Sequence, residues 1–332
     1  MKQRILVTGG GGFLGRSLVR KLLVRGDEVH ILGRSPQPDL DRKGVRVISC
    51  DLADSERVVE ACRGMDTVFH VAARAGVWGS WRSYYEPNVQ GTLAVIEGCR
   101  KAAVPRLVHT STPSVVFNGE PLRNADERMP YGKDWLCHYA HTKALAEREV
   151  LAANEPGKLS TVALRPHLIW GVGDTHLIPR VVERARQGKL RIVGAGENLV
   201  DIVHVENASE AHLLAEAALD EPGRADGKAY FITQGEPVVL WTWINDLLRR
   251  LGAPPVEKRI SLRAAYAAGA TLEGVYRLLG RKEEPPMTRF VAVELAKDHY
   301  FDLSAARRDL AYEPRVSTEA GLEELVRHWE FA

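Results

Sequence analysis

Short runs of apolar and β-branched residues alternate along this chain with longer stretches in which apolar residues recur every three or four positions. The runs predict strands and the stretches predict helices, because these are the side-chain periods of the two structures. Strands are expected at residues 4–7, 28–32, 45–49, 67–71, 106–110 and 161–164. Helices are expected near residues 14–25, 54–63, 86–103 and 138–153. This alternation predicts an α/β fold with a doubly wound parallel sheet.

A glycine-rich turn joins the first predicted strand to the first predicted helix. Residues 8–15 read Thr-Gly-Gly-Gly-Gly-Phe-Leu-Gly. Gly9 permits a tight turn, Gly12 lets backbone N–H groups approach a pyrophosphate, and Gly15 lets the helix pack closely on the strand. The helix N-terminus adds partial positive charge for the phosphates. This context predicts a dinucleotide site of the Rossmann type. The residues expected against the cofactor here are Gly9, Gly12, Phe13, Leu14 and Gly15.

The residue after the second strand indicates which dinucleotide binds. An acidic residue there would hydrogen-bond the ribose 2′-hydroxyl of NAD(H) and repel the 2′-phosphate of NADP(H). Arg34 stands at this position, followed by Ser35. A guanidinium is permanently charged, and its planar fork matches a phosphate. NADP(H) is therefore favoured over NAD(H); a solvated surface arginine is the alternative interpretation.

Further positions are expected beside the cofactor. Asp51 and Leu52 follow the third strand, where a carboxylate could face the adenine amine. The same region could instead cap the helix that starts near Asp54. The fourth strand leads into small residues at Ala72 and Ala73, as close backbone approach to a cofactor would require.

The alternation of strands and helices breaks down after Leu164, where a stretch rich in Gly and Pro follows. Ligands of open α/β sheets bind beyond the carboxyl ends of the strands, so later segments are expected to form a lid there. We expect a Rossmann domain and a smaller C-terminal substrate-binding lobe. The Rossmann domain would comprise residues 1–170 with a return segment near 201–233, and the lobe would comprise residues 171–200 and 234–332.

One tyrosine of the chain, Tyr139, has a lysine four residues further on, Lys143. On a helix this spacing places the two side chains on one face. A nearby ammonium favours the phenolate, so we expect Lys143 to lower the pKa of Tyr139 toward neutral pH. Tyr139 is the predicted general acid, and Lys143 could also hydrogen-bond the nicotinamide ribose. A chance pair on an amphipathic helix is the alternative.

Hydroxyl side chains follow the fifth predicted strand, at Ser111, Thr112 and Ser114. Each could donate a hydrogen bond to a substrate carbonyl oxygen and hold it beside the tyrosine. Serine and threonine at a strand end also satisfy the backbone groups of turns. The sequence leaves these three residues in competition.

Composition narrows the function classes. A net charge of +2 without a dense basic block argues against a nucleic-acid partner. The four cysteines are scattered, and neither they nor the histidines have metal-ligand spacing, so no metal is expected. The N-terminus enters a strand at once, with no signal-peptide h-region, and a cytoplasmic protein is expected.

Residues 261–279 are unusually apolar for a helical stretch, although three charged residues interrupt them. The stretch is too short and too charged to span a bilayer comfortably. A buried core helix is the default expectation, and a hydrophobic pocket wall or a membrane-surface contact is the alternative.

The glycine turn with Tyr139 and Lys143 resembles the extended short-chain dehydrogenase/reductase family over nearly the whole chain. Residues 88–92 look like that family's Asn-Val-x-Gly-Thr helix, and residues 164–174 look like its segment from Arg-Pro to Gly-Asp. The site residues that this resemblance implies are Tyr139, Lys143, Thr112 and Asn88 for catalysis, and Pro166 beside the cofactor. Thr112 stands where the family has its catalytic serine, and Ser111 and Ser114 stay in competition with it.

Within that family the chain is similar to the 3β-hydroxysteroid dehydrogenase branch. Residues 75–80, 110–115, 228–232 and 286–290 look especially like bacterial 2-alkyl-3-oxoalkanoate reductases of olefin biosynthesis. The resemblance implies reduction of the ketone of a hydrophobic 2-alkyl-3-oxoalkanoic acid by NADPH. The alternatives are a 3β-hydroxysteroid or sterol-4α-carboxylate 3-dehydrogenase, a nucleotide-sugar epimerase, and a catalytically silent cofactor-binding protein.

Such a substrate carries a carboxylate next to its ketone, which needs a cationic or N–H partner. Arg165, His167 and Arg289 are the candidates, and the sequence does not rank them. A homodimer, assembly with other enzymes of the same pathway, and peripheral membrane contact stay open as further interactions of the protein.

Overall fold

A seven-stranded parallel sheet forms the centre of the computed structural model, which describes residues 2–329. Its strand order is β12-β7-β5-β4-β1-β2-β3, so the chain winds outward from β1 in both directions. The strands are β1 (Arg4–Thr8), β2 (Glu28–Gly33), β3 (Arg46–Ser49), β4 (Thr67–His70), β5 (Arg106–Thr110), β7 (Ser160–Pro166) and β12 (Lys228–Ile232). All six predicted strands lie in this sheet, and the predicted α/β fold is confirmed.

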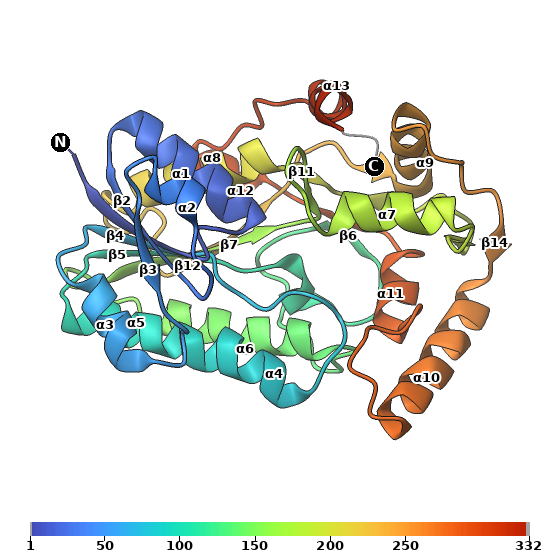
Figure 1. Ribbon diagram of the computed structural model, residues 1–332, viewed down its shortest axis with the longest axis horizontal. Coiled ribbons are helices and arrows are strands. Elements are labelled where there is room, and N and C mark those ends of the chain that lie inside the picture. The colour runs from blue at the N-terminus through green and yellow to red at the C-terminus, as the bar shows by residue number, and fades with distance from the viewer. Residues whose placement is uncertain (1, 330–332) are drawn as a thin grey trace.

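Helices cover both faces of the sheet (Figure 1). One face carries α1 (Phe13–Arg25), α8 (Val205–Ala218) and α12 (Ser304–Leu310). The other face carries α3 (Ser55–Cys62), α5 (Gly91–Lys101) and α6 (His138–Ala152). The region predicted as one helix over 86–103 begins with a π-helical turn, η1 (Glu86–Gln90), which continues α4 (Trp81–Tyr85) into α5. A short helix, α2 (Pro38–Asp41), follows β2.

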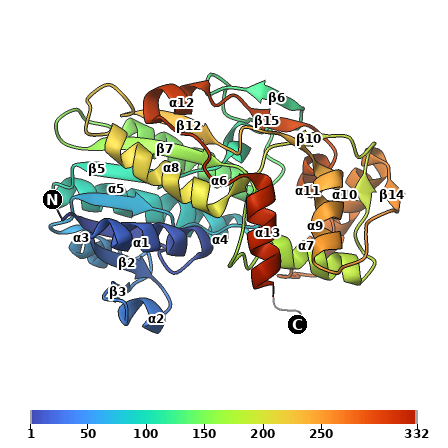
Figure 2. The same cartoon turned by 90° about the horizontal axis from the view of Figure 1, so that it is seen from above.

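A smaller lobe lies beyond the carboxyl ends of the sheet strands (Figures 1 and 2). Its helices are α7 (Leu177–Arg186), α9 (Leu240–Arg250), α10 (Leu262–Leu278), α11 (Arg289–Glu294) and α13 (Thr318–His328). Two strand pairs accompany them, β8 (Ile169–Trp170) with β11 (Val203–His204) and β9 (Ile192–Val193) with β14 (Arg259–Ile260). Buried tryptophans form its centre, with the rings of Trp170 and Trp243 packed edge to face at 5.5 Å.

A second sheet has the order β13-β10-β15-β6. Its strands are β6 (Leu122–Ala125), β10 (Leu199–Val200), β13 (Val238–Val239) and β15 (His299–Phe301). The sequence pattern does not predict β6, because two polar residues, Arg123 and Asn124, separate its apolar residues Leu122 and Ala125. That four-residue strand therefore has neither an apolar run nor an alternating pattern.

Helix α10 is not the buried core helix that its apolar sequence predicts. Only Ala265, Gly269 and Glu273 are buried, and Leu278 is 87% exposed. Gly269 lets the helix approach α11 closely, because a Cβ there would lie 2.6 Å from the carbonyl carbon of Thr288. The helix thus packs through one narrow face. No helix among residues 2–329 is long and apolar enough to cross a membrane.

A buried ion pair ties α6 to the sheet. The Glu147 carboxylate accepts hydrogen bonds from Arg165 Nε at 3.0 Å and Nη2 at 2.6 Å, and from the Tyr131 hydroxyl at 2.7 Å. The side chain of Glu147 is 0% exposed and that of Arg165 4%. Both charges have left water, so each depends on the other for compensation. The pair fixes α6, which carries Tyr139 and Lys143, against β7.

We expect Glu147→Gln to lower the free energy of unfolding by about 3–5 kcal/mol, because it leaves the buried Arg165 charge uncompensated. Denaturant titration followed by circular dichroism measures this loss. Glu149→Gln is the matched control, since Glu149 is exposed on the same helix and its loss is expected to cost no more than about 0.5 kcal/mol. Equal stability of both variants would contradict the importance of the ion pair.

Candidate active site

The glycine turn between β1 and α1 is held in a conformation that side chains would not permit. Gly9 has a φ of +70°, and a Cβ there would lie 2.8 Å from the Cα of Ala72. A Cβ at Gly15 would lie 2.2 Å from the Gly9 carbonyl oxygen, and Gly12 N donates to that same oxygen at 2.9 Å. The turn therefore brings its backbone to the start of α1, as binding of a dinucleotide pyrophosphate requires.

The other predicted cofactor residues surround this turn or follow neighbouring strands. Phe13 and Leu14 begin α1, with Leu14 buried and Phe13 partly exposed. Ala72 N donates to the Thr8 hydroxyl at 3.2 Å, which fixes the segment after β4 against the glycine turn. Pro166 is buried as the last residue of β7. The structure thus collects these residues along the carboxyl ends of the strands.

Arg34 and Asp51 lie at the adenosine end expected for such a cofactor. Arg34 follows β2 and is exposed. Asp51 is also exposed, and its Oδ1 accepts a hydrogen bond from Ala53 N at 3.0 Å. The helix-capping role considered for this region belongs to Asp54, which accepts from Arg57 N at the start of α3. Leu52 is buried and packs closely against Gly91 of α5, where an added Cβ would lie only 2.9 Å from the Leu52 Cβ.

Lys143 is fully buried on α6, beneath the end of β5. Its Nζ donates to the Thr110 carbonyl oxygen at 2.6 Å and lies 3.2 Å from Nε2 of His109. Burial lowers the pKa of Lys143 to about 8. Burial and the Lys143 charge together hold the pKa of His109 well below its usual value, so this ring is neutral and can accept a hydrogen bond from the ammonium group.

Tyr139 lies one helical turn before Lys143, but its pKa departs from the sequence-based expectation. Burial raises the pKa of Tyr139 to about 12, and the neighbouring Thr112 hydroxyl acts in the opposite direction. The expectation that Lys143 lowers this pKa is wrong for the structure described here. The physical reason is burial of the phenol, which disfavours the charged phenolate more than any neighbouring group favours it. The phenol therefore stays protonated at neutral pH.

Of the three competing hydroxyl residues, the structure brings Thr112 beside Tyr139. Thr112 is buried, and its hydroxyl accepts from Ser114 N at 3.3 Å at the start of a 3₁₀ turn, η2 (Pro113–Val116). Ser111 is also buried, and its hydroxyl has no hydrogen-bond partner among residues 2–329. Ser114 is partly exposed. A hydroxyl that already lies next to the phenol is the best placed to share a ligand oxygen with it.

Asn88 connects two parts of the site. Its Oδ1 accepts from Arg74 N at 2.7 Å, and its Nδ2 donates to the Arg74 carbonyl at 3.1 Å. The same Nδ2 donates to the Thr142 hydroxyl at 3.1 Å, next to Lys143 on α6. Asn88 is 1% exposed, so it acts as a positioning residue between the segment after β4 and the helix that carries Tyr139.

Tyr139 packs against a cluster of apolar side chains. Phe117 and Phe290 pack edge to face at 5.2 Å, and Val293 is buried with them. Leu262 from α10 packs against the same cluster as Tyr139. The residues come from the segment after β5 and from α10 and α11 of the lobe, so the lobe contributes an apolar wall to the site.

The three cationic candidates for a ligand carboxylate are occupied. Arg165 bonds Glu147, as described above. Arg289 bonds the buried Glu273 through Nη2 at 2.8 Å. His167 Nε2 lies 2.6 Å from Nδ1 of His299, a residue 132 positions away in the sequence.

These two buried histidines form a cluster with the partly buried Glu294, in which a ring nitrogen of each histidine and a carboxylate oxygen lie within 4.8 Å of one another. Sequence spacing does not reveal such a cluster, because β15 and α11 bring two of its members from the far end of the chain. The two rings bond each other, and His299 Nε2 bonds the Glu294 carbonyl at 2.8 Å. The cluster fastens β7 to the lobe.

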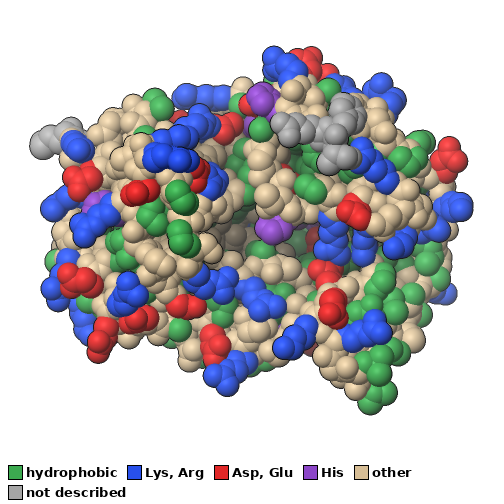
Figure 3. Space-filling model, in the orientation of Figure 1, with side chains coloured by type: hydrophobic (Ala, Val, Ile, Leu, Met, Phe, Trp, Pro, Cys, Tyr) green, Lys and Arg blue, Asp and Glu red, His purple; other side chains and the backbone are tan. Residues whose placement is uncertain are grey.

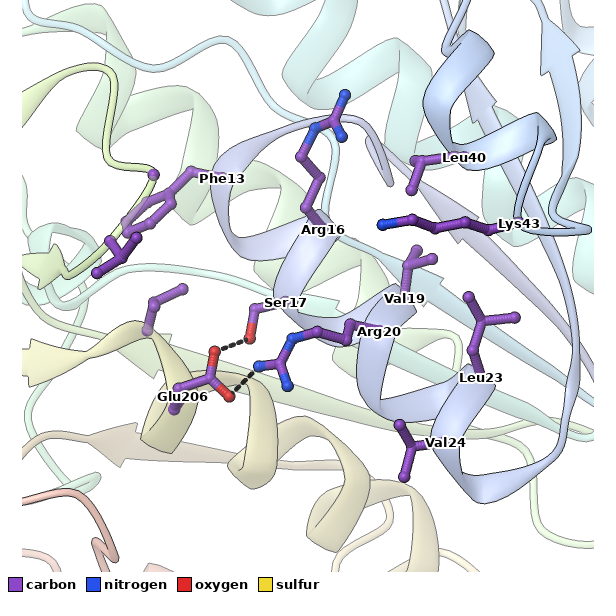
Figure 4. A pocket seen from close by; sticks show the side chains of 13 residues that line it. Phe13, Arg16, Ser17, Val19, Arg20, Leu23, Val24, Leu40, Lys43 and Glu206 are labelled. Atoms are coloured by element: carbon purple, nitrogen blue, oxygen red, sulfur yellow. Dashed lines mark hydrogen bonds and ion pairs between the residues drawn. The ribbon is translucent and has the colours of Figure 1, made fainter. Parts of the chain in front are cut away.

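Figure 3 shows the surface hollowed between the large sheet and the lobe, at the carboxyl ends of the strands. Another hollow, of about 380 Å³, lies along α1 and is lined also by residues of α8 and by the segment after α2 (Figure 4). There Glu206 accepts from Ser17 at 2.8 Å and pairs with Arg20. The residues that line it do not include Tyr139, Lys143 or Thr112.

Comparison with known proteins assigns the chain to a family. Residues 6–263 match the model of the 3-beta hydroxysteroid dehydrogenase/isomerase family. A 2-alkyl-3-oxoalkanoate reductase of Stenotrophomonas maltophilia is 51% identical over 325 residues, which cover 97% of this chain and 98% of that protein. A decarboxylating sterol-4-alpha-carboxylate 3-dehydrogenase of Mus musculus is 34% identical over 329 residues, which cover 98% and 90%.

The fold agrees with this assignment. The solved structure of MoeE5 in complex with UDP-glucose and NAD aligns with a TM-score of 0.75 at 26% identity, covering 98% of both chains. A dTDP-glucose 4,6-dehydratase of Streptomyces venezuelae aligns with a TM-score of 0.75 at 25% identity, covering 98% of this chain and 96% of that one. The chain is an oxidoreductase acting on CH–OH and C=O groups, and it belongs to the 3-beta hydroxysteroid dehydrogenase/isomerase family.

Proposed function

We propose that this protein reduces the ketone of a 2-alkyl-3-oxoalkanoic acid to the 3-hydroxy acid, using NADPH. The observation that carries the proposal is the full-length similarity to a 2-alkyl-3-oxoalkanoate reductase. The apolar cluster beside Tyr139 supports a long alkyl substrate, since each buried CH₂ contributes roughly 0.8 kcal/mol. A sterol-4α-carboxylate 3-dehydrogenase is the second candidate, on the similarity to the mouse protein.

The glycine turn fits a nicotinamide dinucleotide, because only glycine permits the tight turn at Gly9 and the close packing of α1 at Gly15, and this geometry turns the start of α1 toward a pyrophosphate. Such a cofactor supplies a hydride when bound. Tyr139 then donates its phenolic proton to the carbonyl oxygen, for which its raised pKa keeps it protonated. Thr112 donates a second hydrogen bond to that oxygen, and Lys143 supplies positive charge to the new phenolate.

The decisive experiment follows NADPH absorbance with 2-alkyl-3-oxoalkanoic acids, 3-keto sterols and nucleotide sugars in parallel. We expect turnover of the acids, with kcat/KM rising about threefold to fourfold for each added CH₂ that reaches the apolar wall. Turnover confined to the sterols would favour the second candidate. Turnover of nucleotide sugars alone would refute both.

Tyr139→Phe removes the transferable proton and keeps the ring. We expect turnover to fall by roughly 10²-fold or more, while cofactor binding is retained. Steady-state kinetics and fluorescence titration with NADPH measure the two effects. Tyr300→Phe is the control, because Tyr300 lies in β15 of the second sheet. If the Tyr139→Phe variant is as active as this control, the role assigned to Tyr139 is refuted.

Arg34 is the residue that we propose to select NADPH. It is exposed at the end of β2, and among residues 2–329 no carboxylate forms an ion pair with it. A charge-assisted contact with the 2′-phosphate is worth roughly 1.5–3 kcal/mol. We therefore expect NADPH to bind about tenfold or more tightly than NADH.

Arg34→Ala should abolish this preference by weakening NADPH alone, which isothermal calorimetry with both cofactors measures. Arg42→Ala is the control, since Arg42 is an exposed arginine just after α2. Equal affinities of the wild type for NADPH and NADH would exclude NADP selection by this residue.

A further inference from the structure

The proposed substrate carries its carboxylate on the carbon next to the ketone. The residues expected from the sequence to bind this carboxylate are engaged elsewhere. Arg165 and Arg289 each bond a buried glutamate. Burial and His299 hold the pKa of His167 well below its usual value, so this ring is neutral. A carboxylate bound beside Tyr139 therefore needs a cationic partner other than these three residues.

Arg74 is such a cation. It is exposed in the segment between β4 and α4, two residues beyond Ala72. Among residues 2–329 no carboxylate oxygen lies within 4.0 Å of its guanidinium. Instead the guanidinium carbon lies 4.9 Å from the ring centre of Tyr84. A weakly hydrated guanidinium stacked on an aromatic ring keeps its in-plane N–H donors free for a carboxylate.

The backbone of Arg74 is fixed relative to the reacting groups. Both its N–H and its carbonyl bond the buried side chain of Asn88, at 2.7 and 3.1 Å. Asn88 also bonds Thr142, which lies between Tyr139 and Lys143 on the same helix. Arg74 is therefore held in place by the residue that links it to the catalytic helix.

The stacking partner of Arg74 is Tyr84, a buried residue of α4. Tyr84 is 1% exposed, and its hydroxyl donates to the Trp78 carbonyl at 3.0 Å. Tyr84 is among the groups that raise the pKa of Tyr139, and Arg74 is among those that lower the pKa of Tyr84. Val77, three residues beyond Arg74, packs in the apolar cluster with Tyr139. The segment that carries Arg74 therefore packs against the apolar cluster that also contacts Tyr139.

From this arrangement we infer that Arg74 binds the substrate carboxylate, with the ketone oxygen on Tyr139 and the alkyl chains against the apolar wall. The inference rests on the proposed function. It makes Arg74 a specificity-determining residue that separates 3-oxo acids from ketones of the same shape without a charge. A guanidinium suits this role because its fork binds both oxygens of a carboxylate.

The test compares a 2-alkyl-3-oxoalkanoic acid with its methyl ester in wild type and Arg74→Gln. We expect kcat/KM for the acid to fall about 10- to 100-fold, mainly through KM, and kcat/KM for the ester to fall less than about threefold. Arg74→Lys should keep part of the preference for the acid. Arg82→Gln is the control, because Arg82 is an exposed arginine of the adjacent α4 that pairs with Glu86.

Two outcomes would overturn the inference. Equal losses for acid and ester would mean that Arg74 supports the fold of the segment, and a weakened affinity for NADPH would mean that it binds the cofactor. Calorimetric binding of a long-chain 2-alkyl-3-hydroxy acid to both proteins gives a readout without turnover. If the wild type reduces no 3-oxo acid, the proposed function fails, while this binding measurement still decides whether Arg74 recognises a carboxylate.

Discussion

The buried ammonium group of Lys143 is the interaction on which the rest of the site depends. A charge removed from water costs several kcal/mol unless polar partners replace the solvent. Here the Thr110 carbonyl and the His109 ring are those partners. The ring can accept because it is neutral, and the positive charge beside it is one reason why it stays neutral. The charge of Lys143 therefore helps to fix the protonation state of His109 before any ligand binds.

This interaction belongs to a polar row that crosses the sheet. Thr8 of β1 lies opposite His70 of β4, and His70 lies opposite His109 of β5. The Thr8 hydroxyl bonds both His70 and Ala72 N, so the glycine turn and the buried lysine are connected through side chains at one level of the sheet. Burial also lowers the pKa of His70 to about 3, which keeps the row uncharged except at Lys143.

Features encoded by local pattern could be predicted from the sequence, and features made by distant contacts could not. The strands, the glycine turn and the Tyr139–Lys143 pair are each formed by residues that lie close together in the sequence. The partners of Arg165 and His167 lie on other elements, so the sequence offered both as candidate partners of a carboxylate and did not show that they are engaged. The raised pKa of Tyr139 likewise follows from tertiary burial, which the spacing of two residues on a helix does not report.

The hydrogen bonds of Asn88 have a chemical consequence for what this position can hold. Its oxygen faces a backbone N–H, while its nitrogen faces a carbonyl oxygen and the Thr142 hydroxyl. That hydroxyl donates to the His138 carbonyl at 2.8 Å, so it has to accept from Asn88. A carboxylate of the same size would place oxygen lone pairs next to the Arg74 carbonyl and the Thr142 hydroxyl oxygen, which themselves accept hydrogen bonds. An aliphatic side chain would make none of the hydrogen bonds that Asn88 makes. The position thus requires a neutral group with opposite hydrogen-bonding polarity at its two ends, which a carboxamide supplies.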